Sequence, residues 1–161
     1  SEMCIRDRDM SLNNVDIPEF VILVNREKIR ELIYKFDKVF INSVIKNENF
    51  SNTLDKIVNH GIVICAMKKG RIVGYCAFYM NDFESNTIYI SLLAVDDNWQ
   101  GKHIGTNIID YIKKLGRING FEKIRLEVNN SNRTGIKFYQ NNNFYFGGQA
   151  SKNSNYMELL L

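Results

Sequence analysis

Residues 92–106 (LLAVDDNWQGKHIGT) constrain the fold of this chain more than any other stretch of its sequence. The apolar run at 88–95 predicts a buried strand, and a polar turn ends it. A loop containing Gly101 and Gly105 follows, and apolar residues at helical spacing begin directly after it. A helix start offers unpaired N–H groups and the positive end of a dipole, so this arrangement suits an anion. We therefore predict a phosphate-binding loop, with a plain glycine-containing helix cap as the alternative.

Apolar patterns divide the rest of the chain into strands and helices. We predict strands at 20–24, 62–67, 71–80, 87–95, 123–129, 144–146 and 156–161, and helices at 26–41, about 52–61, 104–120 and 132–143. Turn signals at 68–70 and 81–86 make three consecutive strands an antiparallel meander, and residues 147–155 are predicted as a polar loop. The helix between strands 87–95 and 123–129 makes those two strands parallel.

The fold class that follows is α/β (α+β). Its central sheet is mixed and mostly antiparallel, with about seven strands, one parallel pair and about four flanking helices. The 161 residues suffice for one domain with a sizeable core. Residues 1–9 (SEMCIRDRD) are charged and aperiodic, so we interpret them as a tag or non-native leader, with Met10 as a candidate start and 10–161 as a single domain.

Charge and composition exclude several classes of partner. The net charge of +3 is small and the Lys and Arg residues are dispersed along the chain, which argues against a nucleic-acid partner. No apolar run reaches transmembrane length and no signal peptide is visible, so we expect a cytoplasmic protein without a membrane partner. Cys65 and Cys76 fall in apolar strands and Cys4 in the leader, without a CxxC pair. We therefore expect buried thiols, a reducing compartment and no metal site.

Three polar residues beyond the loop are candidates for a functional role. Asn132 and Tyr139 are seven residues apart and so share one face of their predicted helix. Glu127 points away from the apolar side chains of its strand. Tyr139 as a core aromatic and Glu127 as a solvated charge are the alternatives to a functional role. His60, at the end of a short helix, is interpreted as a C-terminal cap.

Two motifs together resemble a known family. Residues 100–105 (QGKHIG) resemble the Gln/Arg-x-x-Gly-x-Gly/Ala signature of the GNAT superfamily of N-acetyltransferases, and residues 132–144 resemble its second motif, Asn-x-x-Ala-x-x-x-Tyr-x-x-x-Gly-Phe. Their order and separation also match, and the resemblance covers residues 20–161. The chain departs from the family at His103 and Asn143, which replace glycines, and at Gly135, which replaces alanine. Only the backbone N–H of residue 103 is needed, so we interpret His103 as an outward-facing loop residue.

The resemblance implies an acyl-CoA N-acyltransferase fold and acetyl-CoA as the cosubstrate, without a metal. It implies that the loop holds the pyrophosphate and that the pantetheine arm runs along a strand that splays from its neighbour. Asn132 would bind the arm or fix the loop, and Tyr139 would protonate the leaving thiolate. The implied cofactor-binding residues are Leu93, Ala94, Val95, Gln100, Gly101, Lys102, His103, Ile104, Gly105, Thr106, Asn132 and Tyr139.

The chemistry also needs a base, because an amine must lose a proton before it attacks a thioester. A backbone N–H near Val95 would stabilise the carbonyl oxygen. Glu127 precedes Tyr139 by twelve residues, a spacing similar to that in the ribosomal-protein N-terminal acetyltransferases, so Tyr139 and Glu127 are the catalytic candidates. Glu84, Asp82 or a water relay are the alternatives for the base, because strand 87–95 contains no acid or histidine.

The acceptor side is expected to come from residues 41–52 and 147–155, which are rich in Asn and Ser. This composition favours a small neutral or zwitterionic primary amine over a polycation. We expect acetyl transfer to that amine by direct attack in a ternary complex. A non-catalytic acyl-CoA-binding or interaction module, or a peptide or protein N-terminal acetyltransferase, is the alternative. The protein is expected to be a monomer or a homodimer, in which strand 157–161 could pair across two copies.

Overall fold

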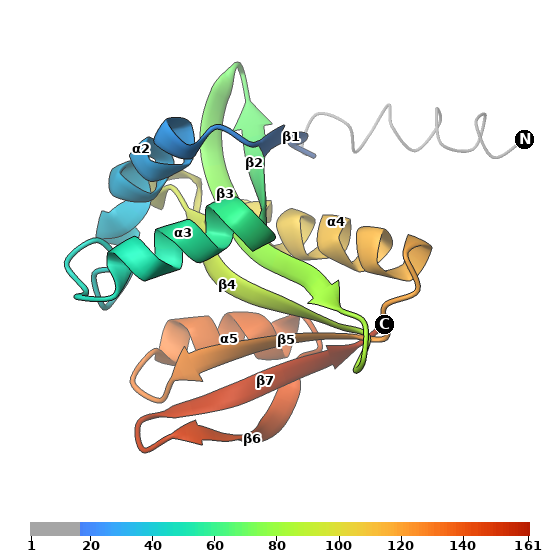
Figure 1. Cartoon of the computed structure of the whole chain (residues 1–161). Helices are drawn as coiled ribbons and strands as arrows, with labels where there is room; N and C mark the ends of the chain where they lie inside the picture. Colours follow the sequence, from blue (N-terminus) through green and yellow to red (C-terminus); the bar gives the residue numbers. More distant parts are fainter. Residues whose placement is uncertain (1–16) are drawn as a thin grey trace, which may run out of the picture.

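Seven strands form one sheet in the order β1-β2-β3-β4-β5-β7-β6. In this computed structural model, residues 17–161 are described, so Cys4 and the predicted leader lie outside the described residues. Helices cover both faces of the twisted sheet, with α2 and α3 on one and α4 and α5 on the other (Figure 1). The strands are β1 (Glu19–Leu23), β2 (Ile62–Lys68), β3 (Arg71–Asp82), β4 (Thr87–Val95), β5 (Lys123–Asn129), β6 (Tyr145–Ser151) and β7 (Ser154–Leu160). The helices are α2 (Arg26–Phe36), α3 (Phe50–His60), α4 (Ile104–Ile118) and α5 (Arg133–Asn141).

The predicted fold class and topology are confirmed. Strands β2, β3 and β4 form the antiparallel meander, and β4 pairs with β5 in parallel across the α4 crossover. The turn between β2 and β3 places Lys69 and Gly70 at positive φ, as a tight hairpin turn requires. Asn25 caps α2 by accepting a hydrogen bond from the Lys28 N–H at 3.0 Å.

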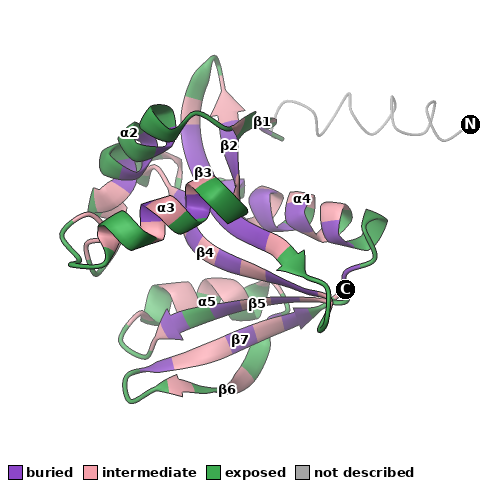
Figure 2. Ribbon diagram, viewed as in Figure 1, coloured by how far each residue is buried: buried purple, intermediate pink, exposed green. Residues whose placement is uncertain are grey.

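Two apolar cores hold the helices to the sheet. One lies between the sheet and α4 and contains Ile104, Ile108, Ile109 and Ile112, each at most 1% exposed. The other lies under α2 and α3 and includes Phe36, whose ring meets Tyr75 edge-on at 5.5 Å. Figure 2 shows the buried residues concentrated on the central strands and on the helix faces that pack against them. The sheet is therefore a rigid support from which the loops at its edges project.

Two helices differ from their predicted bounds. The helix predicted at 26–41 ends at Phe36, because the Asp37 carboxylate accepts hydrogen bonds from the Val44 and Ile45 N–H groups and the Ser43 hydroxyl. These bonds turn the chain into a loop that an apolar pattern does not reveal. The helix predicted at about 52–61 begins earlier, at Phe50, with Asn49 as its cap.

The polar loop predicted at 147–155 is wrong, because most of it belongs to the hairpin β6–β7. The hairpin turns at residues 152–153, and β6 forms an edge of the sheet. An edge strand does not need alternating apolar residues, and the register shifts after Phe146, where Gly148 has φ +113°. The glycines and serines of this segment therefore favoured a loop prediction where a strand forms.

Candidate active site

The parallel strands β4 and β5 separate partway along their length. Their pairing runs from Thr87–Lys123 to Ile90–Leu126 and ends there. On its other side β4 stays paired with β3 up to Val95, with a bulge at Ser91. The β5-facing backbone of residues 91–95 is therefore left without a strand partner. The predicted splay is present, and it lies next to the loop at residues 96–103.

A cavity of about 590 Å³ opens at this splay. The α4 start, the α5 start and the loop after α2 all contribute to its wall. Ten of the predicted cofactor-binding residues line it: Leu93, Val95, Gln100, Gly101, His103, Ile104, Gly105, Thr106, Asn132 and Tyr139. Of the predicted cofactor-binding residues, Ala94 and Lys102 are absent from the lining. Ala94 faces the opposite core, and the Lys102 ammonium lies 5.0 Å from the centre of the Trp99 ring.

The backbone N–H groups of residues 100–106 are left without hydrogen-bond acceptors in the described part of the chain. The first N–H of this region with a backbone partner is that of Asn107, which donates to the His103 carbonyl at 2.9 Å. Within residues 17–161, no acceptor is found for the N–H groups of 100–106, and no side chain caps α4. Such N–H groups at a helix start, with the positive end of the dipole, bind phosphate.

Three backbone positions shape this loop for different reasons. Gly101 has φ +76°, where a side chain would be strained although no atom lies near. His103 has φ +66° and ψ 11°, a left-handed conformation that glycine adopts more readily. Gly105 is required for packing, since a Cβ there would lie 2.8 Å from Cζ of Phe138. His103 is exposed, as predicted, and it also lies on the cavity wall.

Asn132 begins α5 and folds back over its first turn. Its Oδ1 accepts a hydrogen bond from the Gly135 N–H at 2.9 Å, so Asn132 is the N-cap of α5. A Cβ at Gly135 would lie 2.4 Å from Nδ2 of Asn132, so the glycine makes room for this cap. Beyond the other end of α5, Asn143 has φ +69°, the left-handed conformation that suits the glycine it replaces in the family motif.

Tyr139 lies in an aromatic cluster on the cavity wall. Its ring meets Phe138 at 5.2 Å and Phe144 at 5.4 Å between centroids, both edge-on. Burial, with a smaller contribution from Cys76, raises the pKa of Tyr139 well above its usual value. No described residue hydrogen-bonds to its hydroxyl. Tyr139 is therefore protonated at neutral pH, with an uncommitted hydroxyl that can donate a proton or a hydrogen bond.

Glu127 lies on the other face of the sheet from Tyr139. Leu126 and Val128 point into the core under α4, so Glu127 on β5 faces the α2–α3 side. Its carboxylate accepts a hydrogen bond from the Ser154 hydroxyl at 2.6 Å. Glu127 follows directly on Leu126, the last parallel pair, so it stands where the strands begin to separate without lining the cavity itself.

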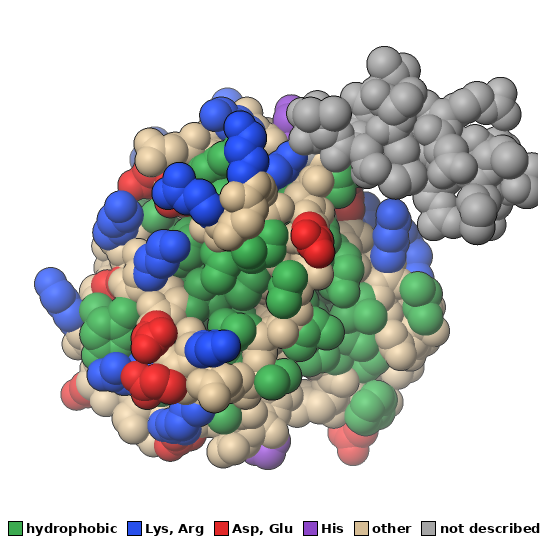
Figure 3. Space-filling model, turned by 90° about the horizontal axis from the view of Figure 1, so that it is seen from above, with side chains coloured by type: hydrophobic (Ala, Val, Ile, Leu, Met, Phe, Trp, Pro, Cys, Tyr) green, Lys and Arg blue, Asp and Glu red, His purple; other side chains and the backbone are tan. Residues whose placement is uncertain are grey.

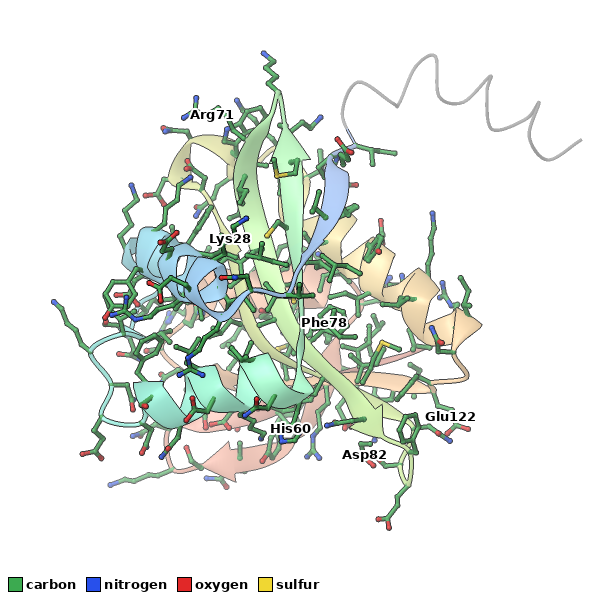
Figure 4. All side chains as sticks on the ribbon, turned by 45° about the horizontal axis from the view of Figure 1, so that its top comes forward. Lys28, His60, Arg71, Phe78, Asp82 and Glu122 are labelled. Carbon is green, nitrogen blue, oxygen red and sulfur yellow. The ribbon has the colours of Figure 1, made fainter. Side chains whose placement is uncertain are left out.

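The alternative acids lie at the far end of the sheet. Asp82 pairs with Thr87, at the start of β4, whereas the cavity lies at the end of that strand. Eight residues of strand span about 26 Å. Figure 4 shows Asp82 at the opposite end of β3 from Arg71. The structure therefore does not bring Asp82, or Glu84 in the same turn, to the cavity.

Sequence reasoning missed part of the cavity wall. Val39, Phe40, Trp99, Thr134 and Phe138 also line it. Trp99 directly precedes the loop motif, and Thr134 and Phe138 flank positions of the second motif, so their places could have been found by extending the motifs. Val39 and Phe40 were assigned to a helix, and nothing in the sequence links them to the cavity.

Two further properties concern the described part as a whole. Residues 17–161 contain no three His, Cys, Asp or Glu side chains grouped to hold a metal ion. Over the same range, no helix has the length and apolarity to cross a membrane. On the face seen in Figure 3, several Lys and Arg side chains lie to one side of an apolar area, and Asp and Glu side chains lie elsewhere around it.

Solved structures with the same fold include three named acetyltransferases. The IAA acetyltransferase from Bacillus cereus is 19% identical over 89% of this chain and 100% of its own, with a TM-score of 0.67. The PaiA N-acetyltransferase from Thermoplasma acidophilum, in complex with coenzyme A, is 18% identical over 89% and 99%, with a TM-score of 0.67. A GNAT family acetyltransferase from Elizabethkingia anophelis with acetyl-CoA bound is 16% identical over 73% and 88%, with a TM-score of 0.62.

At these identities the three structures establish the fold alone. No curated protein matches the chain. The model of the acetyltransferase (GNAT) family matches residues 28–144, which is well over half of the chain and includes both motifs. The fold, the splayed strands and this match agree with one another, and the chain therefore belongs to the acetyltransferase (GNAT) family.

Proposed function

We propose that this protein is an N-acetyltransferase that moves the acetyl group of acetyl-CoA to the primary amine of a small molecule. One observation carries the proposal. The unpaired N–H groups of residues 100–106 share a cavity with Asn132 and Tyr139 at the point where β4 and β5 separate. A phosphate site, an open strand edge and a proton donor are the three features that transfer from a CoA thioester needs.

The cavity fits acetyl-CoA in size and chemistry. Its volume of about 590 Å³ falls in the range of ligand sites. The N–H groups of 100–106 would bind the pyrophosphate, each hydrogen bond to a charged group contributing about 1.5–3 kcal/mol. The backbone of Leu93 and Val95, which has no strand partner on the β5 side, would pair with the amides of the pantetheine arm, although the Gln100 amide already donates to the Val95 carbonyl at 3.1 Å. The α4–α5 face thus holds the cofactor.

The reaction is a direct attack in a ternary complex. The amine nitrogen forms a bond to the thioester carbonyl carbon, the C–S bond breaks, and the proton lost by the amine passes to a base. A backbone N–H near Val95 stabilises the charge on the carbonyl oxygen. Tyr139, which is protonated at neutral pH, gives its proton to the departing thiolate and is reprotonated from solvent. Glu127, at the start of the splay on the acceptor face, is our candidate for the base, with a water relay as the alternative.

The test measures free thiol released from acetyl-CoA with a panel of primary amines, together with the Kd of acetyl-CoA by calorimetry. We expect thiol release with at least one small amine. Tyr139→Phe should lower kcat about a hundredfold without weakening acetyl-CoA binding. Tyr145→Phe is the matched control, because this tyrosine is 44% exposed on the edge strand β6 and should have no effect.

Each other outcome leads to a different conclusion. Tight binding of acetyl-CoA without thiol release from any amine would favour a non-catalytic acyl-CoA-binding module. Thiol release confined to peptide N-termini would replace the small amine with a peptide acceptor. A protein that binds neither acetyl-CoA nor CoA would refute both the enzyme and the binding module.

A further inference from the structure

A second cavity, of about 220 Å³, lies along the parallel pair β4–β5 on the α2–α3 face. Tyr79 and Tyr89 in its lining belong to the core under those helices, and the Lys56 ammonium of α3 lies 5.0 Å from the centre of the Tyr79 ring. At one end the cavity reaches the β3–β4 turn, and at the other it reaches Arg125. Neither motif predicted it.

Arg125 is fixed in this cavity with its hydrogen-bond donors largely unused. Its guanidinium carbon lies 3.7 Å from the centre of the Tyr156 ring. Its Nε atom is buried and makes no hydrogen bond, since Glu158 Oε2 lies 3.4 Å away without suitable geometry. No described residue pairs with its two Nη atoms. A stacked guanidinium with a free fork matches the two oxygens of a carboxylate.

Among the described residues, the acid nearest to Arg125 is Glu158, which stands opposite it on β7. Glu158 Oε2 also lies 3.2 Å from Lys123 Nζ, so one carboxylate is shared between two cations. Asp82, the acid that lines the cavity, accepts a hydrogen bond from the Ser85 hydroxyl at 2.5 Å and lies at the end of β3, toward Lys123. Glu158 is thus shared between Arg125 and Lys123, and neither carboxylate pairs with the Nη atoms of Arg125. Burial raises the pKa of Tyr89, in the same cavity, to about 12, so its hydroxyl remains a donor.

Arg125 and Glu127 are neighbours on one face of β5. They are two residues apart, so their backbones are separated by about 7 Å along the strand. Tyr89 pairs with Arg125, and the β4–β5 pairing ends one residue later at Ile90. A cation that can bind a carboxylate therefore stands one strand repeat from the candidate base, on the face where the acceptor amine would arrive.

We propose that the acceptor is a small zwitterion, whose primary amine lies at Glu127 and whose carboxylate binds the guanidinium of Arg125. This inference rests on the proposed acetyltransferase function and narrows its acceptor from small amines in general to amino acids. Arg125 is then a specificity-determining residue.

The experiment compares acceptors that differ only at the acid end. The panel contains the ω-amino acids from glycine to 6-aminohexanoate, their primary amides, the alkylamines of equal length, aminoalkyl phosphates and a dipeptide. Thiol release from acetyl-CoA gives kcat/KM for each. For the best chain length, we expect the acid to exceed its amide at least tenfold.

Variants of the arginine locate this preference. Arg125→Gln should reduce the ratio of acid to amide to about one through the KM of the acid, and Arg125→Lys should leave an intermediate ratio because it keeps the charge but loses the fork. Arg117→Gln, on the exposed last turn of α4, is the matched control and should keep the wild-type ratio. The Kd of acetyl-CoA, measured by calorimetry, verifies that each variant is folded.

Several results would overturn the inference. Amides used as well as acids by the wild type, or an unchanged ratio in Arg125→Gln, would show that the arginine does not select a carboxylate. Preference for an aminoalkyl phosphate or for the dipeptide would replace the proposed acceptor with that class. If acetyl-CoA binds but no amine releases thiol, the proposed function fails by itself. A calorimetric titration of the acetyl-CoA-bound protein with the acids then decides, and only binding that Arg125→Gln abolishes supports the site.

Discussion

Replacement of Gly105 by alanine tests how closely α4 and α5 must approach to form the cavity. Gly105 is buried in the first turn of α4 and faces the Phe138 ring of α5. A Cβ would lie 2.8 Å from Cζ and 2.9 Å from Cε1 of that ring, closer than real Cβ contacts come. The ring would have to move toward Tyr139, whose centroid is 5.2 Å away, into the cavity that it lines, or together with α5 as a whole.

The net effect follows from two opposing terms. Alanine is favoured over glycine in a helix by about 0.8–1 kcal/mol. Overpacking of a closed contact costs about 1–3 kcal/mol. We therefore expect Gly105→Ala to lower the free energy of unfolding by about 1 kcal/mol. Because both helix starts line the cavity, the Kd of acetyl-CoA should rise about tenfold, equivalent to 1.4 kcal/mol.

A double-mutant cycle with Phe138→Leu isolates the contact. Leucine has no ring atom where the new methyl group would lie, so Gly105→Ala should become neutral or stabilising in that background. Urea unfolding should give a coupling free energy of at least about 1 kcal/mol, well above the 0.3–0.5 kcal/mol expected of independent sites. Two additive effects would refute the steric argument. Loss of acetyl-CoA binding without a change in stability would instead place Gly105 in contact with the ligand.

Two other substitutions test the backbone and the loop after α2. His103→Gly relieves a left-handed backbone conformation that costs about 1–2 kcal/mol, but it adds unfolded-state entropy worth up to about 1 kcal/mol. Urea unfolding should therefore show a free energy of unfolding that is higher by about 0.5 kcal/mol. Acetyl-CoA binding should be retained if only the backbone of residue 103 contacts the ligand. Asp37→Ala removes the acceptor for Ser43, Val44 and Ile45 and should destabilise by about 1–2 kcal/mol at pH 7. Burial of Asp37 acts to raise its pKa in the folded state, but the hydrogen bonds outweigh burial and lower the pKa overall. The difference in stability between the wild type and Asp37→Ala should therefore disappear as the pH falls through that lowered pKa.

The fold was predictable because its elements follow local patterns. The β2–β3 and β3–β4 turns contain residues typical of turns. The helical periodicity of α4 shows that the crossover helix lies between β4 and β5. The splay was expected only from the family resemblance. Strand separation after Ile90 depends on a bulge at Ser91 and on β5 following β7 instead of β4, neither of which leaves a pattern in one strand.

The geometry of the candidate site was predictable where it depends on backbone conformation. The loop at residues 100–106 was predicted from its glycines, and Asn132 from the second motif, because these positions require particular backbone conformations. The loop after α2 was missed because Asp37 organises it through hydrogen bonds to residues that follow later in the chain. Arg125 was passed over for a similar reason. Its isolation depends on Tyr156 and Glu158 of a strand far along the chain, part of which was assigned to a loop.

The departures at His103 and Gly135 have structural explanations in their surroundings. His103 keeps the left-handed backbone of the glycine it replaces, at an exposed position where its side chain meets no crowding from the helices. Gly135 gives up helix propensity, and the space where a Cβ would stand is used by the Asn132 amide that caps the same helix. A cap contributes about 1 kcal/mol, close to what glycine costs, so the exchange is nearly neutral for stability. The exchange does affect the orientation of the Asn132 side chain. With Oδ1 already accepting from the Gly135 N–H, Asn132 offers a molecule in the cavity two amide N–H donors and the one remaining lone pair of Oδ1, so it acts there mainly as a donor.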